Sequence, residues 1–411
     1  MAEPYPIRPV TEDEFDLFES VTNHAFVLPP SSGAHRAHEI ARLEFDRCIA
    51  AFDGADQVGA ATAFSFQLTV PGGQVPTAGV SWVSVLPTHR RRGIMDALMR
   101  RQLGDIRDRG EWAAALLPTE SQLYGRYGYG VATEQAAFTI RRGEGALASD
   151  SPADPAIRLR ITTPRDVRRE ITEVYDAVRQ SRPGFISRPG VWWDRVLREP
   201  GGGYTPLSCL LVEDAAGVRG YALYTGDNRW EDEDGLCDCT LIIRELIATD
   251  PAAGTALWRD LLGRDLVTEV RVRRRPADDP LLLQLADPRR VRARVRDGLW
   301  VRLVDVPAAL SGRSYSCPVD TVIEVRDDLL PGNAGRWRLH AADSGAASCE
   351  RTAAAADVSL GIRELSSAYL GGTRIGSLAG AGMVAEHRAG AVARLSAAMA
   401  WDPSPWCPGT F

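Results

Sequence analysis

The sequence predicts an α/β and α+β fold in which mixed sheets are flanked by helices and the chain divides into three domains. Three observations lead to this prediction. Strands and an amphipathic helix alternate in the first third of the chain, a weaker copy of that order follows, and a smaller α+β pattern comes last. At 411 residues, with 45% hydrophobic and 25% charged residues, the chain is long enough to bury several cores. The domain limits that we predict are 1–148, 149–296 and 297–411.

The first segment begins with a predicted helix over residues 11–22, which two or three strands follow. These strands lie within residues 50–87, where Gly and Pro turns interrupt apolar runs. The stretch "RRGIMDALMRRQLGDIRDRG", residues 91–110, predicts an amphipathic helix, and "WAAALLP", residues 112–118, is typical of a short buried strand. The apolar positions that share one face of this helix are Ile94, Leu98, Leu103 and Ile106.

The middle segment resembles a degenerate copy of the first. It follows "GEGALASDSPADPA", residues 143–156, which is typical of a linker. Residues 211–224 have the strand, turn and strand order of residues 51–64, and Gly254 aligns with Gly93 at the start of the next helix. The arginines that precede Gly93 are replaced in the second copy by Pro251, Ala252 and Ala253. We therefore expect the second copy to keep the fold and to lack an anion site.

The third segment starts near Asp297 with alternating apolar residues and continues as a small α+β domain. Strands are predicted in "TVIEVRD" and "GRWRLHA", and a helix of small residues is predicted within 386–400. The final stretch, "WDPSPWCPGTF", carries Trp401, Trp406 and Phe411 together with three prolines. Because chain ends are usually polar and frayed, we expect this tail to dock in an apolar site.

The composition excludes several classes of protein. All 48 residues counted as lysine or arginine are arginine, since the sequence holds no lysine. The chain therefore has neither a Schiff-base lysine nor the lysine of a phosphate-binding loop. A formal net charge of −6 and the lack of a basic tail argue against nucleic acid as a partner. No apolar run reaches the roughly 20 residues that span a bilayer, and the N-terminus shows no signal sequence, so we expect no membrane partner and a cytoplasmic location.

No pattern of ligands predicts a metal site. The seven cysteines lack zinc-site spacing and are expected to be reduced thiols, and His24, His35 and His38 lack the context that would define a site. Two polar stretches, "HAADSGAAS" at 340–348 and "WEDEDG" at 230–235, are typical of surface loops.

A run of arginines stands where the predicted strand meets the predicted helix of the first segment. A helix N-terminus exposes unpaired amides and carries partial positive charge, and Arg90, Arg91 and Arg92 add donors there, while Gly93 lets the backbone approach a ligand. The combination fits a pyrophosphate cradle, although spacing alone fits a solvated basic helix start equally well. The strand is not followed by G-x-G-x-x-G, which disfavours a nicotinamide enzyme.

An apolar "VSV" strand followed by "RRRGIM" resembles the coenzyme A motif of GNAT acetyltransferases, R/Q-x-x-G-x-G/A, although Met95 stands where a small residue is preferred. The stretch "YGRYGYG" at 124–130, the degenerate second copy, "DGLWVRLVDVPAAL" at 297–310 and the aromatic tail extend the match. The whole chain resembles the Eis-type (enhanced intracellular survival) N-acetyltransferases. This resemblance implies an active GNAT domain, a degenerate GNAT domain and a sterol-carrier-protein-like domain.

The resemblance also implies acetyl-CoA as the co-substrate and assigns residues to it. Val83, Ser84 and Val85 would bind the pantetheine arm, with Thr119 and Glu120 beside it. The residues expected around the pyrophosphate are Arg90, Arg91, Arg92, Gly93, Ile94, Met95 and Asp96.

Acetyl transfer to an amine requires a base for the ammonium and an acid for the departing thiolate. By resemblance, Tyr124 would be the acid, the terminal carboxylate of Phe411 the base, and Phe26 part of the acceptor pocket. Without the resemblance, Tyr124 is typical of core packing, as Tyr127 and Tyr129 are. Transfer would be direct, so we expect neither a covalent enzyme intermediate nor a metal.

The expected acceptor is an amine of an aminoglycoside-like polyamine or of a lysine side chain. The acid and the tryptophan of characterised aminoglycoside acetylators have no clear counterpart near Phe26, so the acceptor stays open. Three alternatives remain: another amine acceptor, a non-catalytic protein that senses CoA or binds lipid, and amino-acid transfer from tRNA, which the absence of lysine disfavours. The resemblance implies a homo-oligomer, a hexamer.

Overall fold

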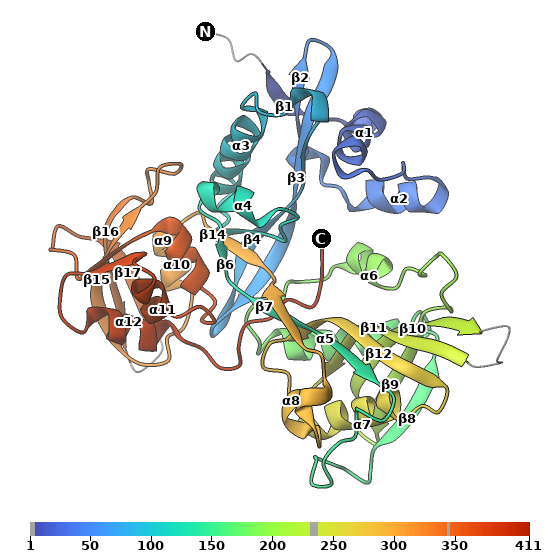
Figure 1. The fold of residues 1–411 in the computed structure, drawn as a ribbon. Coiled ribbons are helices and arrows are strands. Elements are labelled where there is room, and N and C mark those ends of the chain that lie inside the picture. Colours follow the sequence, from blue (N-terminus) through green and yellow to red (C-terminus); the bar gives the residue numbers. More distant parts are fainter. Residues whose placement is uncertain (1–4, 231–236, 343–345) are drawn as a thin grey trace.

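The computed structural model describes residues 5–230, 237–342 and 346–411, and in these ranges the chain forms three sheets (Figure 1). Most of the acidic stretch 230–235, together with Asp343 and Ser344, lies outside the described residues. None of the described helices combines the length and the apolar composition that crossing a bilayer requires.

The first sheet has seven strands in the order β1-β2-β3-β4-β5-β14-β6. Its strands are β1 (Ile7–Pro9), β2 (Ile49–Asp53), β3 (Asp56–Val70), β4 (Gly73–Val85), β5 (Ala113–Leu116), β14 (Trp300–Leu303) and β6 (Gly130–Val131). Its helices are α1 (Phe15–Phe26), α2 (Gly33–Arg42), α3 (Ile94–Asp108) and α4 (Ser121–Tyr124), and its 3-10 turns are η1 (Glu12–Glu14), η2 (Phe45–Arg47), η3 (Pro87–His89) and η4 (Gly125–Tyr127). The strands and the helix predicted for residues 50–118 are therefore confirmed.

The second sheet repeats this arrangement with the order β13-β7-β12-β11-β10-β9-β8. Its strands are β13 (Arg294–Asp297), β7 (Glu134–Arg141), β12 (Val267–Pro276), β11 (Cys237–Ala248), β10 (Gly217–Trp230), β9 (Ser208–Asp214) and β8 (Arg158–Thr162). Its helices are α5 (Arg168–Arg179), α6 (Gly190–Val196), α7 (Pro251–Leu262) and α8 (Leu281–Gln284), with the 3-10 turn η5 (Pro288–Arg290).

The third sheet is smaller, with the order β17-β16-β15-β18-β19. Its strands are β17 (Ala347–Arg351), β16 (Gly335–Ala341), β15 (Val319–Arg326), β18 (Val358–Gly361) and β19 (Val384–Glu386). Its helices are α9 (Val306–Ser311), α10 (Ile362–Ala368), α11 (Ile375–Gly380) and α12 (Ala391–Met399). This is the α+β unit that the sequence predicts.

The first helix differs from its prediction, because α1 begins at Phe15 rather than at residue 11. The Glu14 carboxylate accepts a 3.1 Å hydrogen bond from the backbone N–H of Thr11, and this reciprocal cap stabilises the separate 3-10 turn η1. The helix then extends four residues beyond the predicted end, to Phe26.

Two strands cross the predicted domain limits. β7, from the predicted first domain, pairs with β12 and β13 in the second sheet, and β14, predicted to open the third domain, lies between β5 and β6 of the first sheet. All four residues of β14 are buried. On β14, Arg302 forms a bidentate ion pair of 2.7–2.8 Å with Asp327, which ties the first sheet to the third domain. The limits 1–148, 149–296 and 297–411 thus stay a proposal, and the sheets do not follow them.

The C-terminal tail is docked, as its composition predicts. It runs between the first and second domains, so that the chain end lies near α6 (Figure 1). Trp406 is 4% exposed, its backbone N–H donates to the Pro183 carbonyl at 2.8 Å, and its ring packs edge-on against that of Phe185, with 5.3 Å between the ring centroids. Gly184 has φ +95° and would bring an added Cβ within 2.9 Å of the Trp406 backbone, so this approach requires glycine.

Candidate active site

The first sheet opens between β4 and β5. The two parallel strands pair only as far as Gly79 and Ala115, although β4 continues to Val85. A β-bulge follows on β4, where the pairing with β3 shifts register, and Trp82 takes φ +54°. The divergence of β4 from β5 leaves a cavity of about 850 Å³.

Five of the residues that the family resemblance assigns to a site line this cavity. They come from the end of α1, the bulge of β4, the segment after β5, α4 and the chain terminus: Phe26, Val83, Thr119, Tyr124 and Phe411. Because these segments are far apart in the sequence, their meeting is a property of the fold.

The other assigned residues lie outside the lining of this cavity. Ser84 is buried and its hydroxyl is 3.1 Å from that of Thr22, Val85 is half-buried, and Glu120 is exposed at the N-cap of α4. The remaining assigned residues, 90–96, form the turn into α3 and its first helical turn. Arg90 to Gly93 are exposed, Ile94 is buried, and Met95 and Asp96 are half-buried.

The turn into α3 has the backbone of an open anion site. Arg91 and Gly93 have φ values of +63° and +82°, and no side chain caps the N-terminus of this 15-residue helix. Its first amides therefore face outward with the guanidinium groups beside them. Arg92 donates a 3.0 Å hydrogen bond to the hydroxyl of Tyr5.

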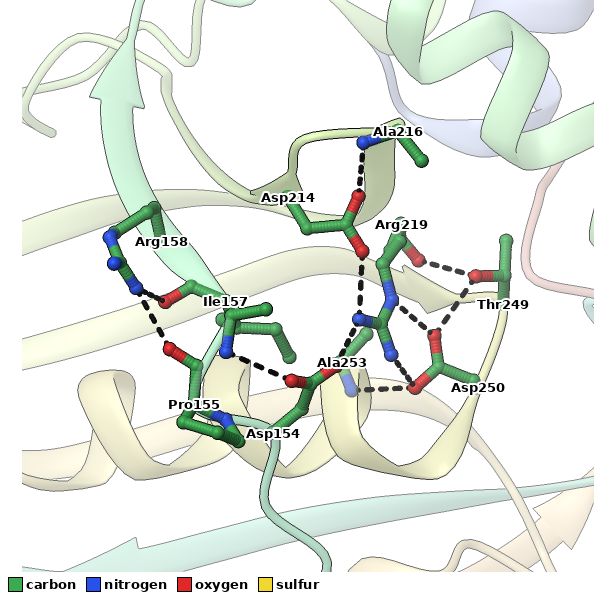
Figure 2. A network of polar contacts seen from close by, with 11 residues as sticks. Asp154, Pro155, Ile157, Arg158, Asp214, Ala216, Arg219, Thr249, Asp250 and Ala253 are labelled. Atoms are coloured by element: carbon green, nitrogen blue, oxygen red, sulfur yellow. Dashed lines mark hydrogen bonds and ion pairs between the residues drawn. The ribbon is translucent and has the colours of Figure 1, made fainter.

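In the second domain, α7 is the corresponding helix, and the carboxylate of Asp250 caps its N-terminus (Figure 2). Asp250 accepts a 3.0 Å hydrogen bond from the Ala253 N–H and two 2.9 Å hydrogen bonds from Arg219, which also pairs with Asp154 at 2.5 Å and Asp214 at 3.0 Å. The hydrogen bonds from Arg219 lower the pKa of Asp250. A carboxylate therefore occupies the N-terminus of α7, whereas the N-terminus of α3 has no such cap.

Tyr124 has the environment of a proton donor. It lines the cavity yet is only 7% exposed, and burial, followed by the nearby charge of Glu120, raises its pKa to about 12. The hydroxyl is therefore protonated at neutral pH. Tyr127 and Tyr129 are buried in the core, as predicted.

Phe411 is held by both its ring and its backbone. The ring packs on Phe66 at 5.3 Å, and Gly79 leaves room for it, since an added Cβ would lie 3.1 Å from the Phe411 ring. One oxygen of the terminal carboxylate of Phe411 accepts a 3.1 Å hydrogen bond from the Ser81 hydroxyl on β4. Within the described ranges, no arginine or histidine forms an ion pair with the terminal carboxylate.

Sequence reasoning missed most of the charged lining of the cavity. These residues come from α1, α2 and the second domain: Glu19, His35, Glu39, Arg42, Arg188, Arg195, Arg198, Glu199, Arg244, Glu245 and Arg274. The stretch "RVRRRP" at 271–276 shows one of these arginines, but only the packing of the second domain against the first turns it toward the cavity. Among the residues that the structure describes, no group of His, Cys, Asp and Glu is arranged to hold a metal ion.

Comparisons with known proteins agree with this architecture. Models of the acetyltransferase (GNAT) domain match residues 6–132 and 184–303, and the sterol carrier protein domain matches residues 306–408. An uncharacterized N-acetyltransferase of Streptomyces coelicolor is 41% identical over 98% of this chain and 99% of its own length. The N-acetyltransferase Eis of Mycobacterium tuberculosis is 36% identical over 95% of this chain and 96% of its own. The crystal structure of Eis1 from Mycobacterium abscessus, 34% identical, superposes with a TM-score of 0.84 over 99% of this chain and all of that one.

Proposed function

This chain belongs to the Eis-type N-acetyltransferases, with two GNAT domains followed by a sterol carrier protein domain, and from that premise we propose that it acetylates an amine in the 850 Å³ cavity. GNAT domains use acetyl-CoA as the acetyl donor. The observation that carries the proposal is that Tyr124 and the terminal residue Phe411 line one cavity at the point where β4 and β5 diverge.

Acetyl-CoA would lie along the bulge of β4, its pantetheine arm against Val83, Ser84 and Val85 and beside Thr119 and Glu120. Its pyrophosphate would occupy the turn from Arg90 to Asp96. The uncapped N-terminus of α3 and the exposed guanidinium groups support this placement.

In the proposed reaction, Phe411 and Tyr124 carry out the two proton transfers. The carboxylate of Phe411 takes a proton from the substrate ammonium, and the resulting amine attacks the thioester carbonyl to form a tetrahedral intermediate. As the intermediate collapses, the C–S bond breaks and Tyr124 donates its proton to the CoA sulfur. The nitrogen of the acetylated product, which still carries two hydrogens and a positive charge, gives one proton to the Tyr124 phenolate, and solvent removes the proton on Phe411, so that one proton is released per turnover. The raised pKa of Tyr124 supports its part, since the donor must be protonated at the start.

We propose a primary amine of an aminoglycoside-like polyamine or of a lysine side chain as the acceptor, held near Phe26. Family resemblance supports two further proposals, a cytoplasmic location and a homohexamer, and light scattering of the purified protein tests the latter.

The experiment that tests the function follows free thiol release from acetyl-CoA in the presence of aminoglycosides, polyamines and lysine peptides, with the C-terminus untagged. Release that depends on an amine supports acetyl transfer. Tight binding of acetyl-CoA without release for any amine would instead favour the CoA-sensing alternative.

A further inference from the structure

The cavity has an arginine-rich side. Arg42 on α2 and five arginines of the second domain line it, and we call this set the arginine wall: Arg42, Arg188, Arg195, Arg198, Arg244 and Arg274. The glutamates of the lining number four: Glu19, Glu39, Glu199 and Glu245. Six guanidinium groups thus face four glutamates and the terminal carboxylate, so positive charge is in excess.

Three of the arginines form ion pairs within the lining and share two glutamates. Arg188 and Glu245 form a bidentate ion pair of 2.6–2.9 Å in which both side chains are 4% exposed. Glu39 pairs with Arg42 and, at 3.5 Å, with Arg198. These pairs use Glu39 and Glu245. Glu199 also lies on the second-domain side of the cavity, where it accepts a 2.8 Å hydrogen bond from the Leu207 N–H and its charge acts on Arg244 without forming an ion pair.

The other three arginines have no ion pair within the described ranges. Arg195 contacts only the hydroxyl of Thr410, at 3.5 Å, and Arg244 donates to the carbonyls of Val196 and Arg198 at 3.0 and 2.5 Å. Neither a hydrogen bond nor an ion pair is formed by Arg274 with any described residue. Charged donors that face a cavity without an acid partner are available to an anion.

Two further observations concern the charge of the arginine wall. Arg42 is 2% exposed, yet its Nε and Nη1 atoms have no hydrogen-bond partner among the described residues. The Arg42 guanidinium stacks over the rings of Trp192 at 4.9 Å and Phe64 at 5.5 Å, so it places a largely desolvated positive charge on this side of the cavity. In addition, burial, together with the charges of Arg42, Arg198 and Arg274, lowers the pKa of Arg195 to about 10. These cations therefore repel one another in the absence of a ligand.

The terminal carboxylate does not supply the missing charge. Its residue bonds to Ser81 on β4 of the first sheet, and it forms no ion pair with the described arginines. Under the proposed mechanism, this carboxylate must also remain free to accept a proton.

We propose that the natural acetyl acceptor is an amine that also bears a carboxylate or a phosphate, which Arg195 and Arg274 bind while the amine faces Phe411. This inference rests on the proposed N-acetyltransferase function, and between the acceptors proposed above it disfavours the purely cationic polyamine. A purely cationic polyamine would meet repulsion from the arginine wall, whereas an anionic amine relieves it.

Matched amines that differ only in the anionic group test the proposal. The pairs are lysine with cadaverine, ornithine with putrescine, and phosphoethanolamine with ethanolamine, and thiol release from acetyl-CoA gives kcat/KM for each. We expect at least about a tenfold preference for the anionic member of one or more pairs, consistent with a charge-assisted hydrogen bond. The carboxylate and phosphate pairs reveal which anion is preferred. The preference should vanish in the double variant Arg195→Gln, Arg274→Gln and persist in Arg169→Gln, a control on α5 whose side chain is 81% exposed.

Binding of an anion to the cavity can also be measured without turnover. Calorimetric titration with glutarate and with inorganic phosphate should detect saturable binding of at least one anion to the wild-type protein and loss of that binding in the double variant. Preference for cadaverine and putrescine during active turnover would overturn the anionic acceptor and leave N-acetyl transfer standing. Absence of both turnover and anion binding would overturn both proposals, whereas anion binding without turnover would support the arginine site alone.

Discussion

The hydroxyl of Ser81 on β4 donates a 3.1 Å hydrogen bond to one oxygen of the terminal carboxylate of Phe411, and so connects the last residue of the chain to the bulge of the first sheet. This bond and the packing of the Phe411 ring fix the chain end in the cavity that Tyr124 also lines. A terminal carboxylate held in this way can act as a catalytic group only while the chain ends at that residue.

An extension after Phe411 should therefore abolish turnover. We expect a C-terminal tag to lower kcat by about a hundredfold or more, because it replaces the carboxylate with a neutral amide and so removes the proposed general base. Acetyl-CoA binding, measured by calorimetry, should change little, since the turn into α3 lies outside the cavity. The same tag at the N-terminus is the matched control. Full activity of the extended protein would show that another group takes the proton.

Replacement of Tyr124 by phenylalanine should lower kcat by about a hundredfold, with little change in KM for acetyl-CoA, because it removes the proton donor and keeps the ring. Tyr129→Phe is the control, since the Tyr129 hydroxyl is buried and has no partner among the described residues. Because the pKa of Tyr124 is raised to about 12, its ionisation should cause no alkaline loss of activity until the pH approaches that value. Steady-state kinetics across pH check both expectations, and equal losses in the two variants would assign Tyr124 a packing role.

The turn into α3 should control affinity for the donor. We expect Arg90→Gln combined with Arg91→Gln to raise KM for acetyl-CoA roughly tenfold, because charge-assisted hydrogen bonds to the pyrophosphate are lost. Arg101→Gln, on an exposed position of the same helix that pairs with Asp105, should leave KM unchanged. Added salt should reproduce part of the effect in the wild-type protein. Unaltered KM in the double variant would place the pyrophosphate elsewhere.

The cap of α7 should matter for stability rather than for donor binding. Asp250→Ala should lower the free energy of unfolding by about 1 kcal/mol, the usual cost of losing an N-cap, and should leave acetyl-CoA affinity unchanged. Since Arg219 lowers the pKa of Asp250, the stabilisation is present above the ordinary aspartate pKa and is lost as the pH falls through the lowered one. The difference between variant and wild type should therefore shrink in acid. Denaturant titrations at several pH values measure this difference in the free energy of unfolding, with Asp108→Ala as a surface control. Improved acetyl-CoA binding by the Asp250 variant would contradict our description of α7.

Much of the fold follows from local patterns. The alternation in residues 50–87 and the apolar face of α3 each depend on neighbours close in sequence. Residues 143–156, predicted as a linker, join β7 to β8 within the second sheet and do not separate two domains. The helix start at Phe15 was misplaced because a side-chain cap on Thr11 competes with helix continuation. The position of β14 was also misplaced, since alternation identifies a strand but not the sheet that it joins.

By itself, the sequence determined the two copies of one fold, the open arginine turn in the first copy and its loss in the second, and a chain end too apolar to stay in water. Only the tertiary structure decided that Phe411 meets Tyr124 in one cavity and that Arg195 and Arg274 of the second domain face the same space. The reason is physical. Periodicity and turn chemistry act over a few residues, whereas these contacts depend on how two sheets and a docked tail pack after long stretches of intervening chain.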